Sequence, residues 1–198
     1  MLNTMTLKNK EVKSRQLSGR KIFLLSTCIS VLTLASCGGG KKDDNANAGV
    51  PAGMVAADLS TQGLAALVNV PDSTVAPLEV MGNAGGGADI KVGKNFQISI
   101  VEGAGNMDMK KNDITHDDVR KFIKYIVEDP NALLWEWQIE GMEPEFHFYA
   151  IVKDGDKSFE VSNLEDVDGG KFSEKAATQM LDAAKTVRVK AAAPKAES

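Results

Sequence analysis

A short apolar segment near the N-terminus limits how much of this chain can belong to its folded part. Residues 22–34 contain no charged side chain, and residues 1–21 before them contain six basic side chains against the single acid Glu11. As a helix the apolar segment would span about 20 Å, whereas the hydrocarbon core of a bilayer is ~30 Å thick. A basic segment followed by a short apolar one is typical of a secretory signal peptide, which is removed after export.

The apolar segment ends in the motif Leu-Ala-Ser-Cys, residues 34–37. This motif resembles the lipobox of bacterial lipoproteins, in which a leucine and two small residues precede a cysteine. The resemblance implies that residues 1–36 are a lipoprotein signal peptide, that signal peptidase II cleaves before Cys37, and that fatty chains such as palmitate are attached to Cys37. Cys28 is the rival attachment residue, but only Ile22–Leu25 would remain as its apolar segment. A plain secretory signal that contains a cysteine by chance is the other alternative.

Removal of the signal peptide changes both the charge and the thiol content. The full chain has 23 basic and 27 acidic residues, and without the six basic and one acidic residue of the signal, 17 and 26 remain, a net charge near −9. No thiol remains for a disulfide, for zinc or for nucleophilic attack, because Cys28 is discarded and Cys37 carries lipid. The negative charge disfavours nucleic acid and anionic lipid as partners. Stable membrane contact is therefore expected only through the N-terminal lipid, since two or more chains suffice to anchor a protein.

Residues 37–57 predict a flexible linker after the lipidated cysteine, because they contain many glycines and almost no large apolar side chain. Gly38 stands where the family's inner-membrane retention signal has an aspartate, which implies delivery to the outer membrane. Lys42-Asp43-Asp44 resembles the surface-export signal of Bacteroidota lipoproteins, although it lies a few residues further from the cysteine. Cell-surface and periplasm-facing locations both stay open.

Residues 58–190 are predicted to form a single domain, followed by a disordered tail over 191–198. The apolar residues 63–71 end in Pro71-Asp72-Ser73 and predict a strand that stops at a turn. A second strand is indicated around residues 96–100, where apolar and polar side chains alternate. Between the two, the glycines at 85–87 predict a loose connection between short strands.

Two helices are predicted in this domain. The first would begin at Thr115 as N-cap, with Asp118 three residues later, and end before Pro130. Its apolar residues recur at helical spacing: Val119, Phe122, Ile123, Ile126 and Val127. The second would begin at Ser173 as N-cap and carry a narrow apolar face: Ala177, Met180, Leu181 and Ala184.

Three strands are predicted between these helices, each from alternating apolar residues. The first has one apolar face: Leu133, Trp135, Trp137 and Ile139. The second places four residues inward, Phe146, Phe148, Ala150 and Val152, and two outward, His147 and Tyr149. A hairpin turn at Asp154-Gly155 leads into the third, in which Phe159 and Val161 face the core.

This order of elements predicts an α+β fold, a largely antiparallel sheet with two main helices packed on it. Residues 115–188 loosely resemble the PsbP-like fold, which bacterial lipoproteins also use. The resemblance lies in the aromatic meander EFHFYAIVKDGDKSFEVS followed by the closing helix SEKAATQMLDAAKTVRV. It implies a fold and no activity, since the family has no invariant catalytic motif.

One candidate metal site stands out, the methionine pair Met107 and Met109. Met-x-Met pairs bind cuprous ion in periplasmic copper proteins, because soft thioethers suit a soft ion. Two thioethers are too few, so Met142 and His147 would have to complete the site. The alternative is a loop whose methionines cover the core. His116 and His147 lack the spacing of zinc ligands, and both are predicted at the surface.

The remaining motifs do not complete a catalytic or cofactor site. Asp166 and Asp168 are spaced as in a calcium loop, but Gly170 and Lys171 replace the required oxygen ligand and glycine. Four acids could supply the carboxylate pair of a glycosidase or merely form an acidic rim: Glu136, Glu140, Glu143 and Glu145. The glycine clusters lack nucleotide-binding spacing, and no serine lies in a GxSxG motif.

These observations predict a lipid-anchored envelope protein without enzymatic activity or cofactor, which presents its sheet or a loop face to a protein or envelope partner. A small-ligand or copper-binding lipoprotein is the alternative. A hydrolase of envelope polymers is the least favoured reading.

Overall fold

The described residues form ten strands, two α-helices and one short 3-10 helix. The computed structural model describes residues 49–74, 76–164 and 171–191. The elements follow one another along the chain as β1 (Met54–Asp58), η1 (Ser60–Gln62), β2 (Ala66–Pro71), β3 (Leu78–Gly82), β4 (Ala88–Val92), β5 (Gln97–Glu102), α1 (Met107–Thr115), β6 (Lys121–Asp129), β7 (Ala132–Gln138), β8 (Glu145–Asp154), β9 (Lys157–Asn163), α2 (Glu174–Ala184) and β10 (Arg188–Val189).

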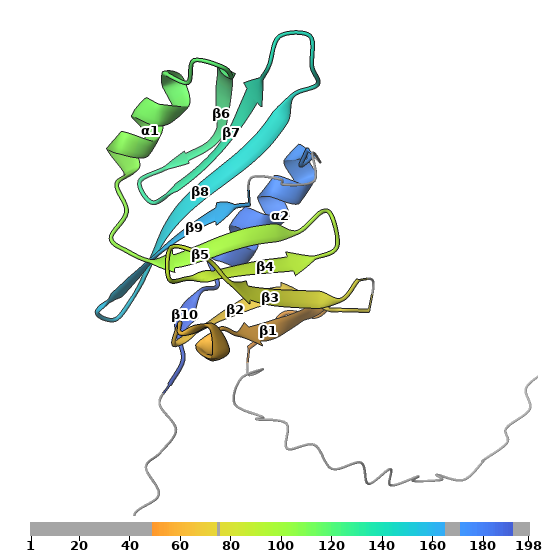
Figure 1. The fold of residues 1–198 in the computed structure, drawn as a ribbon, viewed down its shortest axis with the longest axis vertical. Helices are drawn as coiled ribbons and strands as arrows, with labels where there is room; N and C mark the ends of the chain where they lie inside the picture. The colour runs from red at the N-terminus through yellow and green to blue at the C-terminus, as the bar shows by residue number, and fades with distance from the viewer. Residues whose placement is uncertain (1–48, 75, 165–170, 192–198) are drawn as a thin grey trace, which may run out of the picture. The chain divides into compact units, whose positions relative to one another are not determined.

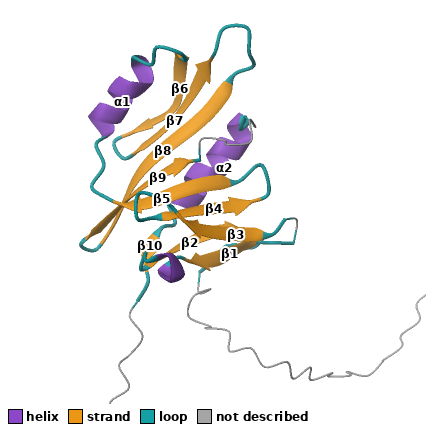
Figure 2. Ribbon diagram, in the orientation of Figure 1, coloured by secondary structure: helices purple, strands orange, loops and turns teal. Residues whose placement is uncertain are grey.

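The strands form two antiparallel sheets, and the predicted α+β class is confirmed (Figures 1 and 2). The larger sheet has seven strands in the order β3-β4-β5-β9-β8-β7-β6, and the smaller has the order β1-β2-β10. Every pairing in both sheets is antiparallel. All of the described residues belong to one compact unit, residues 42–198. No helix in this described part is long and apolar enough to cross a membrane.

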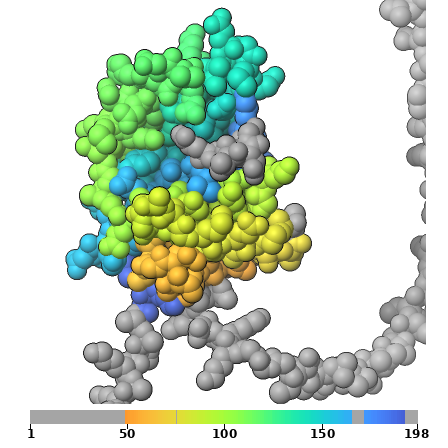
Figure 3. Space-filling view, viewed as in Figure 1, coloured from red at the N-terminus to blue at the C-terminus, as the bar shows by residue number. Residues whose placement is uncertain are grey.

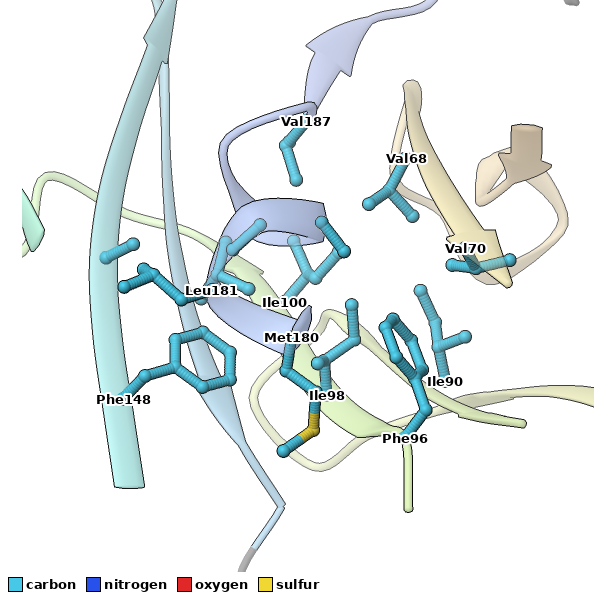
Figure 4. Close-up of a cluster of buried hydrophobic side chains, with 14 of the residues drawn as sticks. Val68, Val70, Ile90, Phe96, Ile98, Ile100, Phe148, Met180, Leu181 and Val187 are labelled. Carbon is cyan, nitrogen blue, oxygen red and sulfur yellow. The ribbon is translucent and has the colours of Figure 1, made fainter. Parts of the chain in front are cut away.

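The second predicted helix is confirmed as α2, and it fills the space between the two sheets. Ser173 caps it, since its hydroxyl accepts the N–H of Ala176 at 3.2 Å. Figure 4 shows α2 between β8 and β2, with Met180 and Leu181 directed at the buried side chains of both sheets. All four residues of the predicted apolar face are buried. This cluster is the main core of the protein.

A second cluster lies on the opposite face of the large sheet, beneath α1 (Figure 1). The strands β7 and β8 therefore bury both faces: Trp135 belongs to the cluster under α1, whereas its neighbour Leu134 belongs to the main core. The prediction that His147 and Tyr149 face outward is wrong. Tyr149 is 7% exposed, and the side chain of His147 is 13% exposed, because α1 covers this face.

The prediction of a helix that begins at Thr115 and ends before Pro130 is wrong, because residues 121–129 form the strand β6. The register of β6 against β7 shifts twice, between Phe122 and Lys124 and between Tyr125 and Val127. Each shift is a β-bulge, which adds one residue to the strand. Phe122, Tyr125 and Glu128 therefore share one face at intervals of three, and this spacing imitates a helix.

The true helix of this region, α1, occupies the segment predicted as a methionine loop. Asn106 is its N-cap, and the side-chain oxygen of Asn106 accepts the N–H of Met109 at 2.9 Å. Thr115, predicted to begin a helix, is the last residue of α1. Only Ile114 of α1 is buried, so the helix has almost no apolar face to recognise in the sequence.

The folded region begins earlier than predicted. Residues 54–57 were assigned to the linker, but they belong to β1, which pairs with β2 from Met54 opposite Pro71 to Asp58 opposite Leu67. The expected strand within 63–71, the glycine connection between β3 and β4 and the hairpin between β8 and β9 are all confirmed. The predicted tail lies almost wholly outside the described residues.

Replacement of Met180 by alanine should lower the free energy of unfolding by about 2–5 kcal/mol, because it leaves a cavity between the two sheets. Met180 is fully buried, whereas Met109 is 62% exposed. The matched variant Met109→Ala should stay within about 0.5 kcal/mol of the wild type. Urea unfolding followed by circular dichroism measures both, and equal effects of the two substitutions would contradict the described core.

Candidate functional site

A hollow of about 800 Å³ lies at the end of the β6–β7 pair. One wall is the connection from α1 into β6, and the other is the chain that leaves β7; both lie at the top of Figure 1. In the space-filling view, the green surface of α1 and β6 adjoins the teal surface of the β7–β8 connection (Figure 3). The lining residues are Thr115, Asp117, Asp118, Val119, Arg120, Lys121, Phe122, Gln138, Glu140 and Gly141. Its volume is in the range of ligand sites.

The wall formed by the α1–β6 connection is held by Asp117. One of its carboxylate oxygens accepts the N–H of Arg120 at 2.6 Å and that of Val119 at 2.9 Å. The hydrogen bond from the Arg120 N–H is the main cause that lowers the pKa of Asp117. This is the local pattern of a helix cap, but here it stabilises a turn that leads into a strand.

Trp137 ties this wall to the rest of the domain. The guanidinium carbon of Arg120 lies 5.0 Å from the centre of the Trp137 ring, a cation–π contact. The indole N–H of Trp137 donates to the backbone oxygen of Ile114 at 3.1 Å, near the end of α1. Arg120 also approaches Asp117, with Nη1 4.0 Å from Oδ2. The position of the wall therefore depends on the aromatic cluster under α1.

One exposed apolar side chain lines the hollow, and two more follow lining residues in the sequence. Among the described residues, five large apolar side chains are exposed, and three of them belong to this region: Val119, Ile123 and Met142. Val119 is 72% exposed and lines the hollow, and Met142 follows the lining residue Gly141. A single exposed apolar residue is ordinary, but a group beside a hollow marks a surface for contact. A molecule bound in the hollow would also make polar contacts with three charged lining residues, Asp118, Lys121 and Glu140.

His147 lies beside the two tryptophans on the face of the sheet that carries the cluster under α1, and its side chain is largely buried. Its ring is stacked on Trp135 with the centres 5.8 Å apart, and it is 5.1 Å from the ring of Trp137. On the same face, the Lys110 ammonium lies 5.7 Å from the ring centre of Trp135 and 5.5 Å from that of Tyr149. The prediction of two surface histidines holds for His116, which is exposed, and is wrong for His147.

The hydrogen bonds of His147 assign its tautomer. The side-chain oxygen of Asn163 accepts the N–H of Phe148 at 2.9 Å, so the amide nitrogen of Asn163 faces His147. That nitrogen lies 3.0 Å from Nδ1 of His147, which must therefore be the acceptor. The ring hydrogen is then on Nε2, 3.4 Å from the carboxylate of Glu145. These contacts give His147 a structural role, since Nδ1 is already engaged.

A second polar pair, which is partly buried, fixes how the chain enters α1. The hydroxyl of Tyr149 donates to Glu160 at 2.6 Å, and burial together with this bond raises the pKa of Tyr149 well above its ordinary value. Gly105 passes directly over this hydroxyl with a φ of +60°, and a side chain there would come within 2.7 Å of it. Only glycine fits this approach, so the pair belongs to the framework of the domain.

The candidate copper ligands do not converge. Met107 packs against the aromatic cluster under α1, whereas Met109 is largely exposed. Residues two apart in a helix point in nearly opposite directions, so the helix separates the two thioethers. Met142 is exposed in the connection between β7 and β8, and Nδ1 of His147 bonds to Asn163. Over the described residues, no group of three His, Cys, Asp or Glu side chains could hold a metal.

The sheet separates two of the four glutamates, because Glu136 and Glu145 lie on opposite faces. Glu136 pairs in register with Phe146 on the face of the main core, and its carboxylate contacts Lys124 at 3.4 Å. Glu145 pairs with Trp137 on the opposite face and contacts Lys171 at 3.4 Å. Glu140 lines the hollow, and Glu143 is exposed.

Three predicted site residues lie outside the described part of the chain. They are the proposed lipid attachment residue Cys37 and the two acids of the calcium-like loop, Asp166 and Asp168. The hollow itself was not predicted. The one signal for it was the capping pattern at Thr115 and Asp118, which is interpreted above as the start of a helix and belongs to the turn into β6.

Comparisons with known proteins give no match to any protein-family model, to any curated protein or to any solved structure.

Titration with cuprous ion should leave the tryptophan fluorescence of the protein unchanged, because α1 separates the thioethers of Met107 and Met109. Copper bound near Met107 would quench Trp135, which belongs to the same cluster. The variant Met107→Leu is the matched control, since it keeps the packing and removes the sulfur. Stoichiometric quenching by the wild type that Met107→Leu abolishes would contradict this geometry.

Proposed function

We propose that this protein is a lipid-anchored, non-enzymatic binding module of the bacterial outer membrane, and that the hollow beside β6 and β7 is its contact site. The motif that ends in Cys37 carries the proposal, because it closes an apolar segment too short to span a bilayer. The predicted linker joins Cys37 to β1, which begins at Met54. Because the negative charge of the chain disfavours contact with anionic lipid, the domain would stand off the membrane surface on this linker.

The residues around the hollow support the proposal that it binds a partner and does not catalyse a reaction. Asp117 and Arg120 are engaged with the backbone and with Trp137, so they hold the shape of the wall. The exposed Val119 and Met142 supply apolar contact area, and the nearby charges supply specificity. A protein or envelope polymer that lays an apolar group between the two walls would suit this arrangement.

A small ligand is the second candidate, and the volume of the hollow favours it. Both proposed functions use the same lining residues. They differ only in whether the molecule that binds in the hollow is a macromolecule or a small ligand. A turnover of esters, glycans or peptides that depends on one carboxylate or serine would overturn the non-enzymatic proposal.

Cells that produce the chain should incorporate labelled palmitate into it, and the variant Cys37→Ser should incorporate none. The matched variant Cys28→Ser should be labelled as the wild type is, because only Cys37 follows the Leu-Ala-Ser motif. Gel fluorography of the purified chain measures the label. Equal labelling of the two variants, or a mature N-terminus elsewhere than Cys37, is the result that contradicts the anchor.

A photo-crosslinking residue at position 119 should give a defined adduct in the cells that make the protein, because Val119 lines the hollow and is 72% exposed. The same residue at position 81 is the control, since Met81 is 45% exposed but lies on β3. Mass spectrometry identifies the adducts. A protein or polymer adduct at 119 and not at 81 is expected, and identical patterns at the two positions would contradict the contact site.

A further inference from the structure

The strand β6 is an outer strand of the seven-stranded sheet, and it pairs only with β7 among the described strands. An outer strand presents a row of backbone N–H and C=O groups along its open side, which can pair with another strand. The opposite outer strand, β3, is partly covered, because Gln62 of η1 donates to the backbone oxygen of Val80 at 3.4 Å. The open edge of the sheet is therefore that of β6.

The charges of β6 are divided between its two halves. Lys121 and Lys124 lie near its start, and Glu128 and Asp129 lie at its end. The inner two have partners within the chain: Lys124 contacts Glu136 at 3.4 Å, and Glu128 contacts Lys111 at 2.8 Å.

The two outer charges of β6 are those of Lys121 and Asp129. No ion pair to Lys121 or to Asp129 occurs among the described residues. Lys121 is opposite Gln138 in the register, and Asp129 is opposite Ala132. Gln138 and Ala132 are an even number of residues apart in β7, so Lys121 and Asp129 lie on the same face of the sheet, the face away from α1.

From this arrangement we infer that β6 pairs antiparallel with β6 of a second copy of the chain, about a two-fold axis at Tyr125. One bulge lies on each side of Tyr125, so the paired positions of β6 are symmetric about it, and corresponding positions on its two sides face each other in such a pairing. Lys121 of each copy then lies opposite Asp129 of the other, on one face of the joined sheet. The symmetry makes this ion pair twice, so Lys121 and Asp129 each obtain a partner of opposite charge.

The charge pattern selects a second copy over an unrelated strand. Lysines and bulges on an outer strand discourage generic pairing, and β6 has both. The antiparallel alignment of two identical strands places the basic half of one against the acidic half of the other. This inference does not rest on the proposed function, since it uses only β6 and its neighbours.

Sedimentation of the full-length chain in a mild detergent, at a large excess of micelles over protein, measures the pairing. The wild type should be a dimer that dissociates on dilution. Lys121→Asp and Asp129→Lys should each raise the dimer dissociation constant at least about tenfold, because each places like charges opposite one another twice. The double variant restores opposite charges and should return to within about threefold of the wild type. Lys94→Asp, on the exposed β4–β5 turn, is the matched control and should have no effect.

Cysteine cross-linking tests the register even where a charge variant folds poorly. A mixture of Lys121→Cys and Asp129→Cys chains should form a disulfide under mild oxidation, since opposing residues in antiparallel strands lie about 5 Å apart. Each variant by itself should not, and the wild type controls for Cys28 and Cys37. A monomeric wild type at about 0.1 mM, a dimer indifferent to the charge changes, or cross-linking of either variant by itself overturns the inference.

Discussion

The structure depends on the burial of both faces of the strand pair β7 and β8. On one face Leu134 and Phe148 contact the core around α2, and on the other Trp135 and Tyr149 lie beneath α1. Strands that are apolar on both faces must be covered on both, because neither face can stay in water. The two helices meet this requirement from opposite sides. The sheet is therefore a central layer, and the smaller sheet closes the far side of α2.

The candidate site follows from this arrangement. Trp137 faces α1, and its indole N–H holds the backbone oxygen of Ile114, so the end of the helix lies above the end of β7. The chain must then turn from α1 into β6, and Asp117 stabilises that turn. The hollow lies between this turn and the chain that leaves β7. β6 is the last strand of the sheet, next to this turn, and it pairs only with β7 among the described strands.

The elements that could be predicted are those whose pattern is complete within a short segment. Helix α2 has its own cap at Ser173 and its own apolar face around Met180, so neighbouring residues suffice to recognise it. The meander β7 to β9 was predictable for the same reason. Strand β6 was not, because its two bulges space Phe122 and Tyr125 as a helix would. Helix α1 has one buried residue, and a single contact leaves no periodic signal.

The sequence by itself determines the charge of the chain, the motif that predicts lipid attachment at Cys37, and the strands and the helix whose periodicity is local. Only the tertiary structure decided which residues meet. Glu136 and Glu145 are close in the sequence, but the sheet places them on opposite faces. His147 was predicted at the surface, but it is largely buried in contact with two tryptophans and Asn163. The physical reason is that strand pairing and helix cover join segments distant along the chain, and no local pattern specifies which face of a strand a distant helix will cover.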